Sequence, residues 1–133
     1  MRFIDTNLLL RYFARDDEAK AEDVKALLQK VENDEEKITT SLCVVFETVF
    51  TLEKYYNTPR QKIKDALSFF LSLNGLRLPD KELYLQALEL YVEKNISFTD
   101  AFNSVFCLKN GIKEIYSYDK DFDQIEGLKR ITP

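Results

Sequence analysis

The chain has 133 residues, of which 45% are hydrophobic and 32% are charged, and its formal net charge is −4. With only three Gly and three Pro, this composition excludes a disordered or fibrous protein and favours one compact, helix-rich domain over residues 1–133. No His is present, which excludes Ser-His-Asp triads and imidazole acid–base pairs.

Short strands alternate with helices in the pattern of apolar residues. In chain order, the pattern predicts a strand at 2–5, helices at 8–13 and 17–32, a strand at 37–40, helices at 41–56 and 59–73, a strand at 76–78, helices at 80–95 and 100–108, and strands at 113–118 and 129–132. This alternation predicts an α/β fold in three α/β/α layers, with a central parallel sheet of four to five strands.

The residues that begin or stop helices stand at several of these boundaries. Ser41 and Thr99 each offer a capping hydroxyl at the start of a predicted helix. Asn74-Gly75 and Gly111 each follow a predicted helix, which is typical of helix ends.

The chain carries no sign of a membrane segment or of a disulfide. Its apolar runs are far shorter than the ~20 residues that span a bilayer, and its start does not resemble a secretory signal, so we expect a cytoplasmic protein. Cys43 and Cys107 lie in apolar, helical surroundings and lack the spacing of metal ligands, so we expect both in the core.

Four acidic residues fall where predicted strands end or where the following helices begin. Asp5 ends the first strand, and Asp119 ends the strand at 113–118. Glu47 lies in the helix after the second strand, and Asp100 lies in the first turn of its helix. Because functional groups of open parallel sheets gather at the carboxyl ends of the strands, we expect these four carboxylates to converge on one cleft.

A cluster of carboxylates has a specific use in phosphodiester chemistry. The groups repel one another unless a cation lies between them, and Mg²⁺ and Mn²⁺ take oxygen ligands. Such ions stabilise the attacking and the leaving oxygen, and they make bound water more acidic, so hydrolysis needs no His. If four carboxylates hold cations, the net charge of −4 leaves the rest of the surface near neutral, and a nucleic-acid partner remains compatible with the composition.

Four segments together resemble the ordered motifs of the PIN-domain family, which includes the VapC-like toxins of toxin–antitoxin pairs. The segments are Phe3-Ile4-Asp5-Thr6-Asn7, Glu47 within residues 41–51, Thr99-Asp100-Ala101, and Ser117-Tyr118-Asp119-Lys120-Asp121-Phe122. The resemblance covers nearly the whole chain, and its specificity lies in the order and spacing of the motifs.

The resemblance implies a metal-dependent endoribonuclease that cleaves RNA, with Mg²⁺ or Mn²⁺ held by Asp5, Glu47, Asp100 and Asp119. It also implies a homodimer and, for a toxin, an antitoxin whose tail blocks the cleft.

Further residues of the site follow from the same resemblance. It makes Asp121 and Asp123 additional acids, Thr6 and Ser117 hydroxyl partners that orient the site, and Asn7 a residue that fixes the first turn. The chain departs from the family pattern at Ser117, where Thr is more usual, and at Phe102-Asn103, where small residues are common. These departures put fine geometry in question, not the acids.

Each acid also has a purely structural explanation. Asp5 can cap the helix that follows it, and Asp100 gains from the dipole at the start of its helix. Glu47 can belong to a polar stripe along its helix, and residues 119–123 can form a solvated turn.

Three other functions compete with the nuclease. A haloacid-dehalogenase phosphatase needs a second Asp where this chain has Asn7, and a response-regulator receiver needs paired acids where Asp5 has no acidic neighbour. The remaining alternative is a non-catalytic PIN-like scaffold that binds RNA or protein. Loss of a central acid would indicate such a scaffold, but this chain has an acid at all four positions.

Overall fold

The computed structural model describes all residues, 1–133, and they divide into two compact units, Met1–Pro79 and Asp80–Pro133. Each unit has its own helices, its own pair of parallel strands and its own buried side chains. None of the helices combines the length and the hydrophobicity that a bilayer crossing requires.

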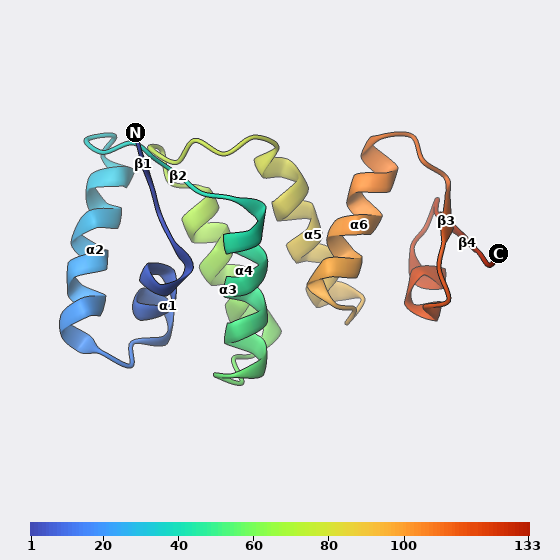
Figure 1. Ribbon diagram of the computed structural model, residues 1–133, viewed down its shortest axis with the longest axis horizontal. Helices are drawn as coiled ribbons and strands as arrows, with labels where there is room; N and C mark the ends of the chain where they lie inside the picture. The colour runs from blue at the N-terminus through green and yellow to red at the C-terminus, as the bar shows by residue number, and fades with distance from the viewer. The chain divides into compact units, whose positions relative to one another are not determined.

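The first unit is a helical cluster around one strand pair. In chain order it contains β1 (Arg2–Phe3), α1 (Thr6–Ala14), α2 (Glu18–Glu32), β2 (Ile38–Thr39), α3 (Leu42–Lys54) and α4 (Arg60–Leu71). The two strands are parallel, and β2 also forms a parallel bridge to Leu76. Helix α1 packs against α2 and α3, and α3 packs against α4 (Figure 1). The carboxyl end of β1 therefore leads directly into a helix that is held on two sides.

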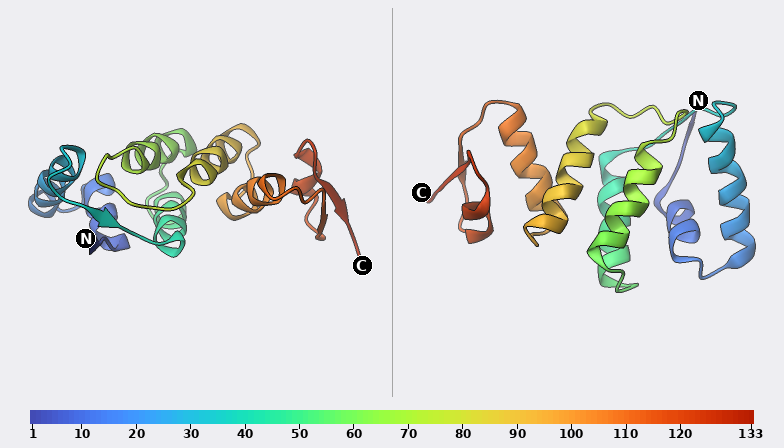
Figure 2. Two further views of the ribbon diagram at one scale, coloured as in Figure 1. Left: turned by 90° about the horizontal axis from the view of Figure 1, so that it is seen from above. Right: turned by 180° about the vertical axis from the view of Figure 1, so that it is seen from behind.

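The second unit is a helical hairpin followed by a strand pair. It contains α5 (Lys81–Glu93), α6 (Phe98–Lys109), β3 (Glu114–Tyr116), the 3-10 helix η1 (Lys120–Gln124) and β4 (Lys129–Ile131). Helices α5 and α6 lie side by side in the views of Figure 2 and make the most extensive helix contact of the chain. Strands β3 and β4 are parallel, and η1 connects them while packing against β4 and α6. The start of α6 and the end of β3 are thus parts of one compact unit.

The order of the elements follows the predicted alternation, and both strand pairs are parallel, as the sequence predicted. Several elements differ from the prediction in their bounds, and two of these differences have a direct structural explanation. The predicted strand at 76–78 is reduced to the single bridge between Leu76 and Ile38. The helix predicted from Asp100 begins at Phe98, because Ser97 and not Thr99 is its N-cap.

The prediction for the two cysteines is half wrong. Cys107 is buried, but Cys43 is exposed. Cys43 shares the exposed side of α3 with Glu47, four residues further on, whereas the buried side carries Val45 and Val49. An apolar neighbourhood in the sequence did not distinguish the two sides of this helix.

Gly75 lies where the chain passes between the end of α2 and β2. Its N–H donates to the Val31 carbonyl at 2.9 Å, and its carbonyl accepts from the Ile38 N–H at 2.9 Å. A Cβ at this position would lie 2.7 Å from the Val31 carbonyl oxygen and still closer to that of Glu36. The sequence assigned Asn74-Gly75 to a helix end, but α4 already ends at Leu71, so the glycine is required by a close approach of backbones.

We expect Gly75→Ala to lower the free energy of unfolding by about 1–3 kcal/mol, because backbone carbonyls must move to admit the methyl group. Urea denaturation measures the change. Gly111→Asn is the control: this glycine has a φ of +70°, which Asn tolerates, and nothing lies within 4 Å of its Cβ position. A Gly75→Ala protein as stable as the wild type would contradict the close approach.

Candidate metal centre

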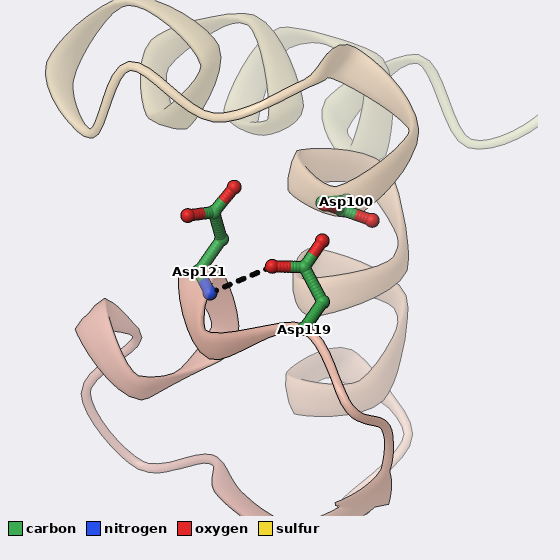
Figure 3. Close-up of side chains that lie close together, drawn as sticks. All are labelled: Asp100, Asp119 and Asp121. Atoms are coloured by element: carbon green, nitrogen blue, oxygen red, sulfur yellow. Dashed lines mark hydrogen bonds between the residues drawn. The ribbon is translucent and has the colours of Figure 1, made fainter.

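Asp100, Asp119 and Asp121 bring their carboxylates together in the second unit (Figure 3). One oxygen from each of the three groups lies within 4.8 Å of the others. Asp100 comes from the first turn of α6, Asp119 is the N-cap of η1, and Asp121 lies in the first turn of η1. Asp100 and Asp121 are half-buried, whereas Asp119 is exposed to solvent.

The backbone of Asp100 is fixed by a helix cap. The Ser97 hydroxyl accepts a hydrogen bond from the Asp100 N–H at 3.0 Å. Ser97 and Asp100 have the spacing of a capping box, with Asp in the place of the usual Glu or Gln. The positive end of the α6 dipole also favours a carboxylate at this position. The structural explanation of Asp100 is therefore correct, but it does not account for the two carboxylates beside it.

Asp119 and Asp121 are held by hydrogen bonds between residues two positions apart in the chain. The Ser117 hydroxyl accepts from the Asp119 N–H at 3.0 Å, and Asp119 Oδ1 accepts from the Asp121 N–H at 2.9 Å. The Ser117 N–H donates to the Ile131 carbonyl at 3.1 Å, which connects this segment to β4. The two acids thus occupy a turn with defined geometry.

The cluster shifts the pKa of Asp100. Burial and the neighbouring Asp119 carboxylate raise this pKa from its ordinary value, and the charge of Asp121 adds to the effect. A hydrogen bond with Ser97 acts in the opposite direction. Asp100 therefore carries its negative charge at a cost that a proton or a cation can relieve.

Asp123 is engaged differently from the other acids of this segment. Arg130 Nε donates to one carboxylate oxygen at 3.0 Å and Arg130 Nη2 to the other at 3.2 Å. The hydrogen bonds to Asp123 are also the main reason why the pKa of Arg130 is raised. Asp123 is consequently not part of the three-carboxylate cluster.

Asp5, Thr6 and Glu47 lie in the first unit. The buried Thr6 hydroxyl donates to Glu47 Oε2 at 3.3 Å, which links the start of α1 to α3. Asp5 occupies the N-cap position of α1, but its side chain makes no capping hydrogen bond. The capping explanation of this carboxylate therefore finds no support, and the exposed group is free for another role.

Asn7 borders a pocket of about 390 Å³ between α1 and α2. The other lining residues are Leu8, Arg11, Lys20, Asp23, Val24 and Leu27. None of the four central acids lines this pocket.

The residues predicted from the sequence thus fall into two groups, one in each unit. The first unit holds Asp5, Thr6, Asn7 and Glu47; the second holds Asp100, Ser117, Asp119, Asp121 and Asp123. The structure brings Asp121, which was predicted only as an additional acid, into the cluster with Asp100 and Asp119.

Sequence reasoning missed two residues of this region. Ser97 was detectable, because a hydroxyl residue three positions before an acid is the pattern of a capping box. Arg130 was not, because no local pattern pairs a strand residue with an acid in the preceding 3-10 helix.

The donor atoms of the cluster fit a hard divalent cation. Carboxylate oxygens are the ligands that Mg²⁺ and Mn²⁺ prefer, and three such groups can share one ion. The second unit contains no His, and its one cysteine, Cys107, is buried and stands outside the cluster, so no softer donors compete there.

Two comparisons with known proteins identify similar sequences. A family model described as the PIN domain matches residues 2–128. The chain is also similar to the VapC ribonuclease of Aquifex aeolicus (strain VF5), with 28% identity over 133 residues that cover 100% of this chain and 97% of that protein. The match extends through both units, so it includes the positions of all the acids described above.

We expect Asp119→Asn to stabilise the metal-free protein at neutral pH, because it removes repulsion while an amide oxygen remains to accept from the Asp121 N–H. Because the pKa of Asp100 is raised in the fold, this group adds to the stability of the fold when the pH lies below its ordinary pKa. This contribution to stability is lost as the pH rises through the raised pKa. The gain in Tm, roughly 1–3 °C, should therefore grow with pH.

Thermal unfolding in EDTA between about pH 4 and about pH 8 measures this difference. Asp23→Asn, which removes one charge from the exposed surface of α2, is the control. A variant whose Tm follows that of the wild type at every pH would show that the carboxylates do not interact.

Proposed function

The chain belongs to the PIN-domain family, and from this membership we propose that it is a metal-dependent endoribonuclease that hydrolyses phosphodiester bonds of RNA. The observation that carries the proposal is the cluster of Asp100, Asp119 and Asp121. The full-length similarity to a protein named VapC ribonuclease supports the same activity.

In this mechanism the chain's own residues bind the metal ion and keep the ligand side chains in position. Asp100, Asp119 and Asp121 would hold Mg²⁺ or Mn²⁺, and Ser97 and Ser117 fix these acids through the backbone. When bound, the ion would supply an acidic water and positive charge opposite the departing oxygen. Because Asp100 is half-buried, its carboxylate would bind a cation more strongly than a fully solvated one.

We extend the proposal to the acids of the first unit. Asp5 and Glu47 would complete one site with Asp100 and Asp119, and the two units would form a single domain over residues 1–133. Support comes from the Asp5 carboxylate, which does not cap α1, and from Glu47, which the Thr6 hydroxyl holds.

This single domain would contain one central sheet. Both strand pairs are parallel, and together they would give four strands of a central sheet, with the segment at Leu76 as a fifth, between two layers of helices. The outer edge of β1 is unpaired, and an unpaired edge favours the addition of a further strand.

The biological setting follows from the same family. The chain would be the toxin of a toxin–antitoxin pair, acting on cytoplasmic RNA. An antitoxin would block the acids, with a basic side chain offered to the carboxylates. We also propose a homodimer. The alternative of a non-catalytic scaffold that binds RNA or protein is opposed by the acids at all four central positions.

We expect purified protein to cleave a mixed pool of structured RNAs with Mg²⁺ or Mn²⁺ and to lose this activity in EDTA. Asp5→Asn should lower the rate by roughly 100-fold or more, since the metal contributes several kcal/mol to the transition state. The fold should persist, because the Asp5 side chain makes no capping hydrogen bond. Cleavage at the wild-type rate by Asp5→Asn would exclude a catalytic role of Asp5. If the wild type cleaved no RNA with either Mg²⁺ or Mn²⁺, the non-catalytic scaffold would be favoured.

Metal binding tests whether the acids of both units share one site. In a Mn²⁺ titration followed by EPR, we expect Asp5→Asn and Asp119→Asn each to raise the Kd by at least about 10-fold, with Asp23→Asn as the control. If Asp119→Asn lost binding while Asp5→Asn bound Mn²⁺ like the wild type, the second unit alone would hold the metal and the shared site would be wrong.

A further inference from the structure

Arg130 makes three hydrogen bonds to the segment that carries Asp119 and Asp121. Nε and Nη2 donate to the two carboxylate oxygens of Asp123 at 3.0 Å and 3.2 Å. Nη1 donates to the Ser117 carbonyl at 3.3 Å. The Arg130 side chain is only 18% exposed, whereas that of Asp123 is 51% exposed, so the bond to the Ser117 carbonyl is the one that is partly buried.

These bonds fasten the segment at both of its ends. Ser117 stands two residues before Asp119, and Asp123 stands two residues after Asp121. The planar guanidinium contacts both positions at once, which a flexible Lys ammonium does not reproduce. Arg130 is itself placed by β4, whose register with β3 pairs Arg130 with Ile115.

We propose that Arg130 is a positioning residue of the metal centre: by holding residues 117 and 123, it directs Asp119 and Asp121, and not Asp123, toward Asp100. The inference rests on the proposed metal-dependent function. According to this inference, Arg130 determines which of Asp119, Asp121 and Asp123 can serve as metal ligands. Arg130 itself makes no hydrogen bond to the clustered carboxylates.

Charge and position make opposite predictions for Arg130. A cation near a cation site opposes metal binding, so loss of the Arg130 charge alone would make Mn²⁺ bind more tightly. Loss of positioning would make Mn²⁺ bind more weakly, because groups that orient ligands typically contribute about 10–100-fold in affinity. The sign of the change therefore distinguishes the two effects.

The experiment is a Mn²⁺ titration of the full chain by EPR, with the wild type, Arg130→Gln and Arg130→Lys. We expect both variants to raise the Kd by roughly 10-fold and to alter the EPR spectrum of the bound ion. Arg130→Lys keeps the charge, so it remains informative if Arg130→Gln folds poorly. Lys129→Gln is the matched control, because it removes the same charge from the neighbouring residue of β4, whose side chain is exposed.

RNA cleavage adds a second measurement. Cleavage by Arg130→Lys should need a higher Mn²⁺ concentration for its half-maximal rate than cleavage by the wild type; an unchanged requirement for Mn²⁺ would contradict a role in metal positioning. Unchanged binding in Arg130→Lys together with tighter binding in Arg130→Gln would overturn the inference while leaving the nuclease intact. A wild-type protein that binds no Mn²⁺ would instead overturn the proposed function and this inference with it.

Discussion

Repulsion among the carboxylates of Asp100, Asp119 and Asp121 is the constraint around which the second unit is organised. The three groups lie within 4.8 Å of one another, and the pKa of Asp100 is raised, by burial and by its acidic neighbours. An isolated turn would relax by moving these side chains apart. Helix α6 packs against α5 through buried Leu88, Tyr91 and Phe102, and hydrogen bonds to Ser97 and Ser117 hold the backbones that carry the acids.

Both units fix their acids with hydroxyl groups close to helix starts. In the second unit, Ser97 and Ser117 accept from the N–H groups of Asp100 and Asp119. In the first, the Thr6 hydroxyl donates to Glu47, and a separate buried hydroxyl, that of Thr40, donates to the Ile4 carbonyl at 2.9 Å. Hydroxyls suit this task because they satisfy backbone and carboxylate groups without adding a charge that would cancel the cluster.

The elements, the acids and local supports such as Ser97 and Ser117 could be predicted from the sequence, but contacts between separate elements could not. Apolar spacing gave α2 its buried residues Ala21, Val24 and Val31, because a helix face repeats within one element. The close approach at Gly75 and the contact between Arg130 and Asp123 depend on how separate elements meet. The same limit applies to Asp121 and Asp123. The sequence predicted both alike as additional acids, and they are distinguished by the hydrogen bonds that Arg130 makes to Asp123.

The absence of His determines how such a site responds to its surroundings. The chain has no imidazole, the side chain whose ordinary pKa lies closest to neutrality. The carboxyl group with a raised pKa is that of Asp100, within the cluster, so protons and a divalent cation would compete for the same oxygens there. A metal ion that displaced the proton would also reduce the repulsion, and its binding would thereby be linked to the stability of the second unit. The acids proposed to hold the metal would then also be the residues through which pH and metal concentration act on the fold.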